Sequence, residues 1–335
     1  MIKSDTLGVI GRLNHCGIMT NYQCNAACRH CLYACSPDRS GGYISKETAQ
    51  DICTSLVKGG CKSVHIGGGE PFLNFNGLIN LLEATRKTGI QVDYIETNGF
   101  WAADENLATS YLHELSKAGV DALCISLDPF HAEYIPYSLP LRLAEICKNN
   151  HFGYFLWQEH FSKILASVPQ HKIHNRKKLE KLISPNYVLE TARNYGVKMG
   201  GRAINIEKEY MEPKDLADLL NSTPCRNLLS TDHFHVDLYG KFIPPGCTGI
   251  AIPLEEALNG IPERKYPAFE SLLFGGVAKL YEYAKKRGFA KSEKKIKNEY
   301  TSSCALCFHI RKWLSERAGC PELNAEHYKA SLSCY

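Results

Sequence analysis

Apolar residues recur along the first two hundred residues in two alternating patterns, short β-rich runs and longer runs with a helical period. The short runs predict six strands, at residues 17–22, 63–66, 92–96, 122–127, 152–157 and 197–200. The longer runs predict five helices, at residues 44–58, 75–87, 107–118, 139–149 and 177–195. Several of these helices are followed by a glycine, as is common just past a helix C-terminus.

Six strand–helix repeats predict an α/β fold in which the strands form a parallel sheet with right-handed crossovers. Six strands are too few for a closed eight-stranded barrel, so we expect a partial (β/α)6 barrel. Residues 158–175 are rich in His and Lys and weakly patterned, and we interpret them as a loop insertion near the barrel mouth.

The strand–helix alternation ends after Asn205. Residues 211–220 predict a short helix or linker, and residues 233–244 alternate apolar and polar positions, which predicts a hairpin. Residues 279–297 are a lysine-rich helical stretch that we interpret as a solvated face. We therefore predict two domains: a partial barrel over residues 1–205, and a small cysteine-rich α+β domain over residues 206–335.

Composition and charge narrow the class of protein only a little. The chain has 335 residues, 44% of them hydrophobic, which is enough for one large domain with a smaller attachment. The net charge of +4 is mild and gives no reason to expect nucleic acid or a membrane surface as a partner. No run of about 18 apolar residues is present, and residues 1–13 lack a secretory signal, so we expect a cytoplasmic location.

Fifteen cysteines are many for a chain without an export signal. Several lie two or three residues apart, which in a reducing compartment indicates metal ligation rather than disulfide bonds. Four others lie within or beside apolar periodic segments and are interpreted as small buried hydrophobic residues: Cys53, Cys61, Cys124 and Cys147.

The stretch YQCNAACRHCLYACSP follows the first predicted strand and contains four cysteines. Cys24, Cys28 and Cys31 have the spacing C-x3-C-x2-C, and Cys35 comes four residues later. Four thiolates would complete the ligand set of an electron-carrying [4Fe–4S] cluster. Three thiolates would leave one iron with a free coordination position for another molecule, just as catalytic zinc sites keep one position free.

The three-cysteine motif resembles the signature of the radical S-adenosylmethionine (radical SAM) superfamily, with His30 as the aromatic-type residue before the third cysteine. Further matches follow in that family's order, over roughly residues 17–205 of the chain. They are GGGEP at 67–71, ETNGFW after the third strand, SLDPFH after the fourth and GGRA at 200–203. A tight turn alone is the alternative explanation of the glycine run.

The resemblance implies that Cys24, Cys28 and Cys31 hold a [4Fe–4S] cluster whose fourth iron binds SAM. In the family, the reduced cluster cleaves SAM to a 5′-deoxyadenosyl radical, which abstracts hydrogen from a C–H bond. Arg202 is expected to pair with the SAM carboxylate. The residues expected to contact SAM are His30, Gly67, Gly68, Gly69, Glu70, Asn98, Ser126, Asp128 and Arg202.

A second cysteine set lies after residue 205 and comprises Cys225, Cys247, Cys304 and Cys307. Its order resembles the auxiliary-cluster domains of the same superfamily, called SPASM when they hold two clusters and twitch when they hold one. It is similar to the arrangement in the aminocyclitol dehydrogenase of that superfamily. We therefore expect one auxiliary [4Fe–4S] cluster, and two clusters in the whole chain. A structural zinc site with four cysteine ligands is the alternative.

The resemblance leaves the reaction open. TNGFW and SLDPFHAEYIP are similar to a group that includes epimerases of ribosomally made peptides, so we expect epimerisation, crosslinking or oxidation of a peptide or protein. A flavodoxin- or ferredoxin-type electron donor and a monomeric state are also expected. A sugar-like or aminocyclitol substrate is the alternative, and a non-enzymatic cluster or zinc scaffold is a further one. Basic residues 171–181 form either a solvated face or a site for an acidic group.

The sequence does not single out the groups that act on the substrate. Thiols that could return a hydrogen atom are Cys16, Cys35, Cys320 and Cys334. Polar residues that could act as a general base are Asp128, His131, Glu159, Asp232 and His235. The catalytic candidates we retain are Cys35, Cys320, Cys334, Asp128 and His131.

Overall fold

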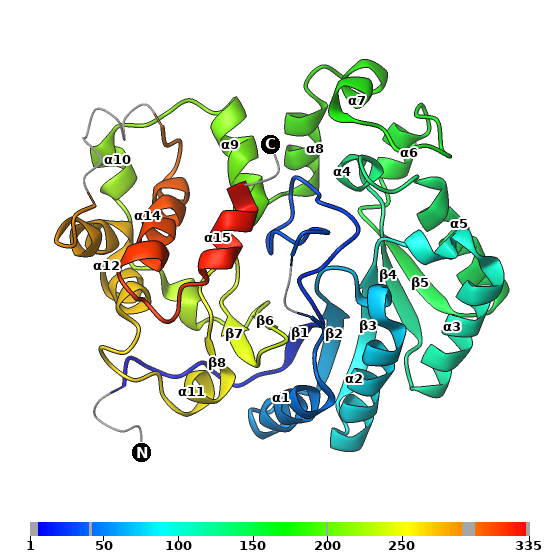
Figure 1. Cartoon of the computed structure of the whole chain (residues 1–335), viewed down its shortest axis with the longest axis horizontal. Coiled ribbons are helices and arrows are strands. Elements are labelled where there is room, and N and C mark those ends of the chain that lie inside the picture. Colours follow the sequence, from blue (N-terminus) through cyan, green and yellow to red (C-terminus); the bar gives the residue numbers. More distant parts are fainter. Residues whose placement is uncertain (1–5, 40–41, 199, 290–298, 333–335) are drawn as a thin grey trace.

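The first five strands form one parallel sheet, in the order in which they follow along the chain. The computed structural model describes residues 6–39, 42–198, 200–289 and 299–332. The strands are β1 (His15–Met19), β2 (Ser63–Gly67), β3 (Gln91–Thr97), β4 (Ala122–Ser126) and β5 (Gly153–Trp157). Each pairs in parallel with the next, so their carboxyl ends lie along the same edge of the sheet (Figure 1). Five of the six predicted strands are confirmed.

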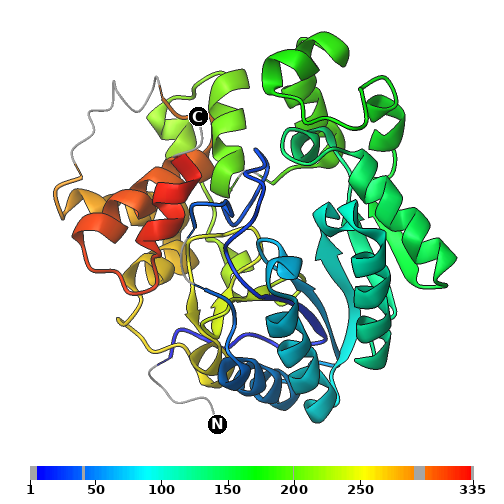
Figure 2. The same cartoon turned by 45° about the vertical axis from the view of Figure 1, so that its right-hand side comes forward.

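Helices connect these strands and cover the outer face of the sheet (Figure 2). They are α1 (Lys46–Lys58), α2 (Phe75–Thr88), α3 (Glu105–Lys117) and α5 (Ser138–Asn149). The side chains of Ser45, Asn74 and Asp104 accept hydrogen bonds from backbone amides in the first turns of α1, α2 and α3. These bonds satisfy donors that a helix start leaves without a partner. Shorter elements follow β2, β3 and β4, namely η1 (Pro71–Asn74), η2 (Phe100–Ala103) and α4 (Pro129–Ala132).

Three short strands extend the sheet on the β1 side. β6 (His235–Val236) pairs in parallel with β1, β7 (Lys241–Ile243) pairs antiparallel with β6, and β8 (Ile252–Pro253) pairs antiparallel with β7. The order across the sheet is β5-β4-β3-β2-β1-β6-β7-β8. This confirms the predicted hairpin, whose turn contains Gly240 at a φ of 71°. It also confirms the α/β fold class, as an unclosed sheet of mainly parallel strands.

The sixth core strand expected at residues 197–200 is absent from the residues described there. Residues 197, 198 and 200 belong to no strand, and β6 instead adds to the opposite side of the sheet, beside β1. Two consecutive glycines, Gly200 and Gly201, weaken strand formation because they add conformational entropy and no packing side chain. The first part of the chain is therefore an open barrel built on five parallel strands.

The segment after β5 contains helices that the sequence pattern did not separate. α6 (Phe161–Leu165) lies within the expected loop insertion at 158–175. The single helix predicted over 177–195 is two helices, α7 (Arg176–Leu182) and α8 (Tyr187–Tyr195). Pro185 lies between them, and a proline both lacks an amide donor and disfavours the helical conformation of the residue before it.

The last third of the chain forms a mainly helical layer beside the sheet (Figure 1). Its elements are η3 (Gly201–Ala203), α9 (Ile204–Tyr210), α10 (Leu216–Leu220), η4 (Arg226–Leu229), α11 (Leu254–Asn259), α12 (Pro267–Lys285), α14 (Ser303–Arg317) and α15 (Ala325–Leu332). α10 confirms the short helix predicted within 211–220. α12 ends at Lys285, and residues 290–297 of the predicted lysine-rich stretch lie outside the described residues.

The buried apolar residues form two hydrophobic cores. The first surrounds β1–β5 and also contains Phe234, Val236 and Phe242 from the hairpin region. The second is formed by α12, α14 and their neighbours and includes Ile204. The hairpin thus belongs to the core of the first part, and the division at residue 205 stays a prediction. No helix in the described part of the chain is long and apolar enough to cross a membrane.

Candidate active site and cysteine centres

The loop between β1 and α1 brings four cysteines to the carboxyl edge of the sheet, between the strands and the C-terminal helices (Figure 1). Cys24, Cys28, Cys31 and Cys35 all line one cavity of about 350 Å³. The loop folds on itself, because the Cys31 amide donates to the Cys28 carbonyl at 3.1 Å and the Cys24 amide donates to the Ser36 carbonyl at 3.2 Å. The cysteines of the three-cysteine motif therefore face one common space.

Cys31 is surrounded by groups that favour its thiolate. The largest effect is a hydrogen bond from the Cys35 thiol, which lowers the Cys31 pKa. Burial opposes this effect, but the Arg202 guanidinium adds to it, and the Cys31 pKa is well below its usual value. The Cys35 amide also donates to Cys31 Sγ at 3.4 Å. A thiolate is the form of cysteine that binds iron.

Cys35 is a protonated thiol beside that thiolate. Its hydrogen bond to Cys31, and then burial, raise its pKa well above the usual value. Its Sγ also lies 3.7 Å from the Gly68 carbonyl oxygen, to which it donates. These contacts fit a free thiol in the cavity wall better than a fourth metal ligand.

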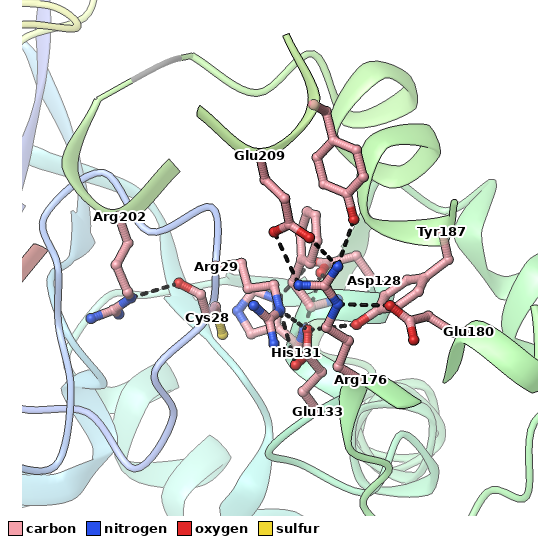
Figure 3. Close-up of polar contacts among 12 residues, drawn as sticks. Cys28, Arg29, Asp128, His131, Glu133, Arg176, Glu180, Tyr187, Arg202 and Glu209 are labelled. Carbon is pink, nitrogen blue, oxygen red and sulfur yellow. Dashed lines mark hydrogen bonds and ion pairs between the residues drawn. The ribbon is translucent and has the colours of Figure 1, made fainter. Parts of the chain in front are cut away.

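Arg202 is fully buried and binds the cysteine loop. Its Nε donates to the Cys28 carbonyl at 3.0 Å (Figure 3). Its terminal nitrogen donates to the Cys35 carbonyl. Its backbone amide donates to the Cys31 carbonyl at 3.0 Å. Arg202 is not among the residues that line the cavity, and its expected pairing with the SAM carboxylate stays a prediction.

Both glycine motifs approach the cysteine loop too closely for any side chain. A Cβ at Gly69 would lie 1.9 Å from the Gln23 carbonyl oxygen, and one at Gly201 would lie 2.1 Å from the Leu32 carbonyl oxygen. Only glycine leaves room for such backbone contacts. The GGGEP backbone therefore reaches the cavity that the cysteines line.

Glu70 ties the GGGEP motif to the end of β3. Its carboxylate accepts hydrogen bonds from the amides of Phe72 and Asn98, at 3.1 and 2.8 Å, and from the Thr97 hydroxyl at 2.9 Å. Burial raises the Glu70 pKa to about 7, against the effect of these bonds. Asn98 in turn donates to Asn25 Oδ1 at 2.8 Å, which connects β3 to the cysteine loop.

A group of two histidines and an aspartate lies beside Cys28 at the end of β4. Asp128 caps α4, and its Oδ2 lies 2.6 Å from His131 Nδ1 (Figure 3). Although burial opposes it, the Asp128 carboxylate raises the His131 pKa well above its usual value, so His131 is a cation. His30 stacks on Phe130 at a centroid distance of 5.1 Å, and burial lowers its pKa to about 4. Both imidazoles line the cavity.

The second cysteine set comes together in the C-terminal layer. Cys225 precedes η4, Cys247 follows β7, and Cys304 and Cys307 lie in the first turns of α14. Burial and the neighbouring thiols raise the pKa of Cys225, Cys247 and Cys307 to about 11 in each case. Arg311, one turn further along α14, is buried and interacts with Cys307. The four predicted ligands thus lie close together beside one positive charge.

Two of the thiols expected as hydrogen donors, Cys16 and Cys320, lie in the hydrophobic cores and do not line the cavity. Cys320 is buried in the second core, where it contacts Tyr283, and its role as a hydrogen donor stays a prediction. Cys334 lies outside the described residues. Cys16 is buried beside Cys61, in the first core.

The cavity wall contains both expected and unexpected residues. The expected SAM contacts that line it are His30, Gly68, Gly69, Glu70, Asn98 and Ser126. Gly67 and Asp128 do not line it. Lining residues that were not expected from the sequence include Tyr33, Glu96, Trp157, Tyr195 and His233. Glu96 and Trp157 lie at strand ends, which could have indicated them, whereas Tyr195 and His233 are placed there only by the fold.

The family model described as the Radical SAM superfamily matches residues 18–156 of this chain. The chain is 33% identical over 119 residues to the putative peptide biosynthesis protein YydG of Bacillus subtilis (strain 168), which is 35% of this chain and 36% of that protein. It is 30% identical over 129 residues to the GTP 3′,8-cyclase of Peptoclostridium acidaminophilum, which is 38% of each chain. The matched part is thus little more than a third of each relative.

Similarity also extends to solved structures. The crystal structure of Streptococcus suis SuiB bound to S-adenosylmethionine aligns with 81% of this chain and 68% of that chain, at 16% identity and a TM-score of 0.39.

Proposed function

We propose that this chain is a radical SAM enzyme that binds a [4Fe–4S] cluster through Cys24, Cys28 and Cys31, and SAM in the adjoining cavity. The observation that carries this proposal is that the three thiols and the GGGEP backbone line the same cavity. With both bound, the cofactors supply reductive cleavage of SAM and hydrogen abstraction from a substrate C–H bond.

The chain's own residues prepare the thiols for this role. Arg202 fixes the loop through two carbonyl oxygens, and its charge favours the Cys31 thiolate. Burial raises the pKa of Cys28, and the neighbouring His131 cation offsets part of this rise. Thiolates at these positions are the ligands that an iron–sulfur cluster needs.

Cys225, Cys247, Cys304 and Cys307 hold an auxiliary [4Fe–4S] cluster in this proposal. A structural zinc site with four cysteine ligands is the alternative, and iron and zinc analysis distinguishes the two. The buried Arg311 would offset part of the cluster's negative charge.

A peptide is the substrate class that we propose, with a flavodoxin- or ferredoxin-type protein as electron donor. The similar Bacillus subtilis protein is named for peptide biosynthesis. β5 lies at an edge of the sheet, and its Tyr154, Phe155 and Trp157 are 39%, 40% and 42% exposed. An extended peptide can add to such an edge, and Trp157 would lead it to the cavity. Cys35 and His131 are then the candidates for hydrogen or proton transfer.

A small phosphorylated or sugar-like substrate is the second candidate. The matched GTP 3′,8-cyclase is named for a reaction of a nucleotide. Lys177, Lys178 and Lys181 line a separate open hollow of about 340 Å³, where a phosphate group would meet positive charge.

Anaerobic reconstitution with iron and sulfide tests the two cluster sites. We expect about eight irons per chain, and about four in Cys28→Ala, since each cluster contains four. Cys147→Ala is the matched control, because that thiol is buried in α5 and belongs to neither set. About four irons together with one zinc in the unaltered chain would contradict the auxiliary cluster.

Incubation with SAM, dithionite and candidate peptides in D2O tests the activity. The unaltered chain should release 5′-deoxyadenosine, and Cys28→Ala should not. Deuterium in the peptide would indicate epimerisation through an exchangeable thiol, and a loss of two hydrogens would indicate crosslinking or oxidation. A chain with full iron content that forms no 5′-deoxyadenosine would overturn the proposal.

A further inference from the structure

Four histidines from distant parts of the sequence meet inside the open barrel. His15 and His65 lie on the neighbouring strands β1 and β2, and His233 and His235 lie just before and within β6. β1 stands between β2 and β6 in the sheet, so side chains on the same face of these strands converge in front of it. His233 and His235 also line the cavity that the cysteines share.

Three of these imidazoles present nitrogen atoms to one point. One ring nitrogen from each of His65, His233 and His235 lies within 4.8 Å of the others. The Nε2 atoms of His65 and His235 are 3.1 Å apart. Two nitrogens on one tetrahedral zinc are about 3.3 Å apart, because Zn–N bonds are about 2.0–2.1 Å. The separation is therefore close to that of two ligands of the same ion.

His15 contacts His65 on the side away from the other two imidazoles and orients its ring. Its Nε2 lies 2.9 Å from His65 Nδ1, and its Nδ1 lies 3.0 Å from an oxygen of Asp93. With His15 Nδ1–H donating to Asp93, its Nε2 accepts from His65 Nδ1–H, which leaves the lone pair of His65 Nε2 directed inward. Histidines that bind metals are commonly oriented by such a second hydrogen bond.

The histidines are also in the protonation state that binds metals. Burial, followed by the neighbouring imidazoles, lowers the His235 pKa to about 3 and the His65 pKa well below its usual value. Burial and the Lys198 charge lower the pKa of His233 as well. All three are neutral imidazoles at pH 7, with lone pairs available for a cation.

Two strand glycines leave space around the group. A Cβ at Gly17 would lie 2.5 Å from the Nε2 atoms of both His65 and His235. A Cβ at Gly67 would lie 2.5 Å from Glu96 Oε2. The other Glu96 oxygen is 3.9 Å from His65 Nε2, so a carboxylate stands beside the three nitrogens at the cavity wall.

We propose that His65, His233 and His235 form a site for a divalent transition metal of the zinc type at the inner wall of the cavity, with Glu96 beside it. Three imidazole ligands suit zinc and its neighbours in the first transition row. A three-histidine site leaves a position open, as in catalytic zinc centres. That position faces the cavity and would take a water molecule or a carbonyl or carboxylate oxygen of the substrate.

Zinc chloride titration of the full-length chain with both cluster sites loaded, against a chromophoric chelator, tests the site. We expect one zinc per chain and an X-ray absorption spectrum dominated by nitrogen and oxygen ligands at about 2.0–2.1 Å. Sulfur ligands at about 2.3 Å would instead indicate zinc on cysteines.

Histidine variants assign the zinc to this site. His233→Ala, at an exposed position, should lose the bound zinc, and His15→Ala should weaken the affinity by about 10–100-fold, as loss of an orienting hydrogen bond does. His113→Ala is the matched control, because His113 is exposed on α3, and it should bind zinc normally. Circular dichroism of each variant confirms that it is folded.

Two outcomes would overturn the inference. They are the absence of zinc with nitrogen ligands in the unaltered chain, and full zinc binding by a folded His233→Ala. Either would mean that the histidines form only a hydrogen-bonded chain from Asp93 to the cavity. Iron content and 5′-deoxyadenosine formation, measured on the same preparation, show separately whether the radical SAM proposal holds. A failure of the histidine metal site can therefore be told apart from a failure of the proposed function.

Discussion

The guanidinium of Arg202 donates to the carbonyl oxygens of Cys28 and Cys35 and lies near the Cys31 thiolate. Each buried carbonyl that loses its donor costs about 1–3 kcal/mol. A lysine would keep the positive charge, but a single ammonium cannot reproduce the planar fork of donors. The planar shape of the Arg202 side chain is therefore needed, in addition to its charge, to bind both loop carbonyls.

Arg202→Lys is expected to lower the iron content of the Cys24–Cys28–Cys31 site and to reduce the free energy of unfolding by about 1–3 kcal/mol for each carbonyl left without a donor. Iron analysis and urea denaturation measure the two effects. Arg193→Lys, at an exposed position of α8, serves as control and should change neither. Normal iron content and stability in Arg202→Lys would show that the fork of hydrogen bonds is dispensable.

At the scale of elements, the cysteine loop is held between two backbone segments that belong to different parts of the barrel. GGGEP follows β2, and GGRA forms η3 after the end of α8. Gly201 adopts the left-handed conformation at a φ of 53° and contacts the Leu32 carbonyl. The close approach of these backbones places the thiols relative to the sheet.

Gly201→Ala is expected to displace the cysteine loop and to reduce iron binding, because the added Cβ would collide with the Leu32 carbonyl oxygen. Gly89→Ala is the matched control. Gly89 is also left-handed, at a φ of 79°, but an added methyl group there would have no atom within 4 Å. The control should lose only the about 1–2 kcal/mol of a left-handed alanine and keep its iron. Equal iron content in the two variants would refute the role of the close approach.

For the whole molecule, the hairpin joins the C-terminal third of the chain to the barrel. β6 extends the sheet beside β1, and Phe242 of β7 is fully buried in the first core. Asn205 donates to the Ser331 carbonyl at 3.0 Å, which links α9 to α15. We therefore expect the two parts of the chain to unfold together.

Phe242→Ala should lower the free energy of unfolding of the entire chain by about 3–5 kcal/mol, as is usual when a buried phenylalanine is truncated. Urea unfolding followed by circular dichroism, together with the loss of cluster absorbance, should show one shared transition at lower urea. Phe274→Ala, at a residue 53% exposed on α12, is the control and should change stability by about 0.5 kcal/mol or less. Two separate transitions, of which only one moves, would contradict a shared fold.

Local patterns allowed much of this protein to be predicted. The periodic spacing of apolar residues predicted five parallel strands and the helices between them, because this spacing depends only on residues close in sequence. The spacing of Cys24, Cys28 and Cys31 and the glycine motif at residues 67–71 are likewise local, and the fold places them at one cavity. The hairpin around Gly240 could be predicted from its turn residues for the same reason.

Tertiary structure decided what depends on residues far apart in the chain. Arg202 binds the cysteine loop because η3, which follows α8, places it beside the Cys28 and Cys35 carbonyls. β6 lies beside β1, and this pairing brings His235 to His65 across 170 residues of sequence. No local period encodes such a meeting, since it arises only when strands distant in sequence become neighbours in one sheet.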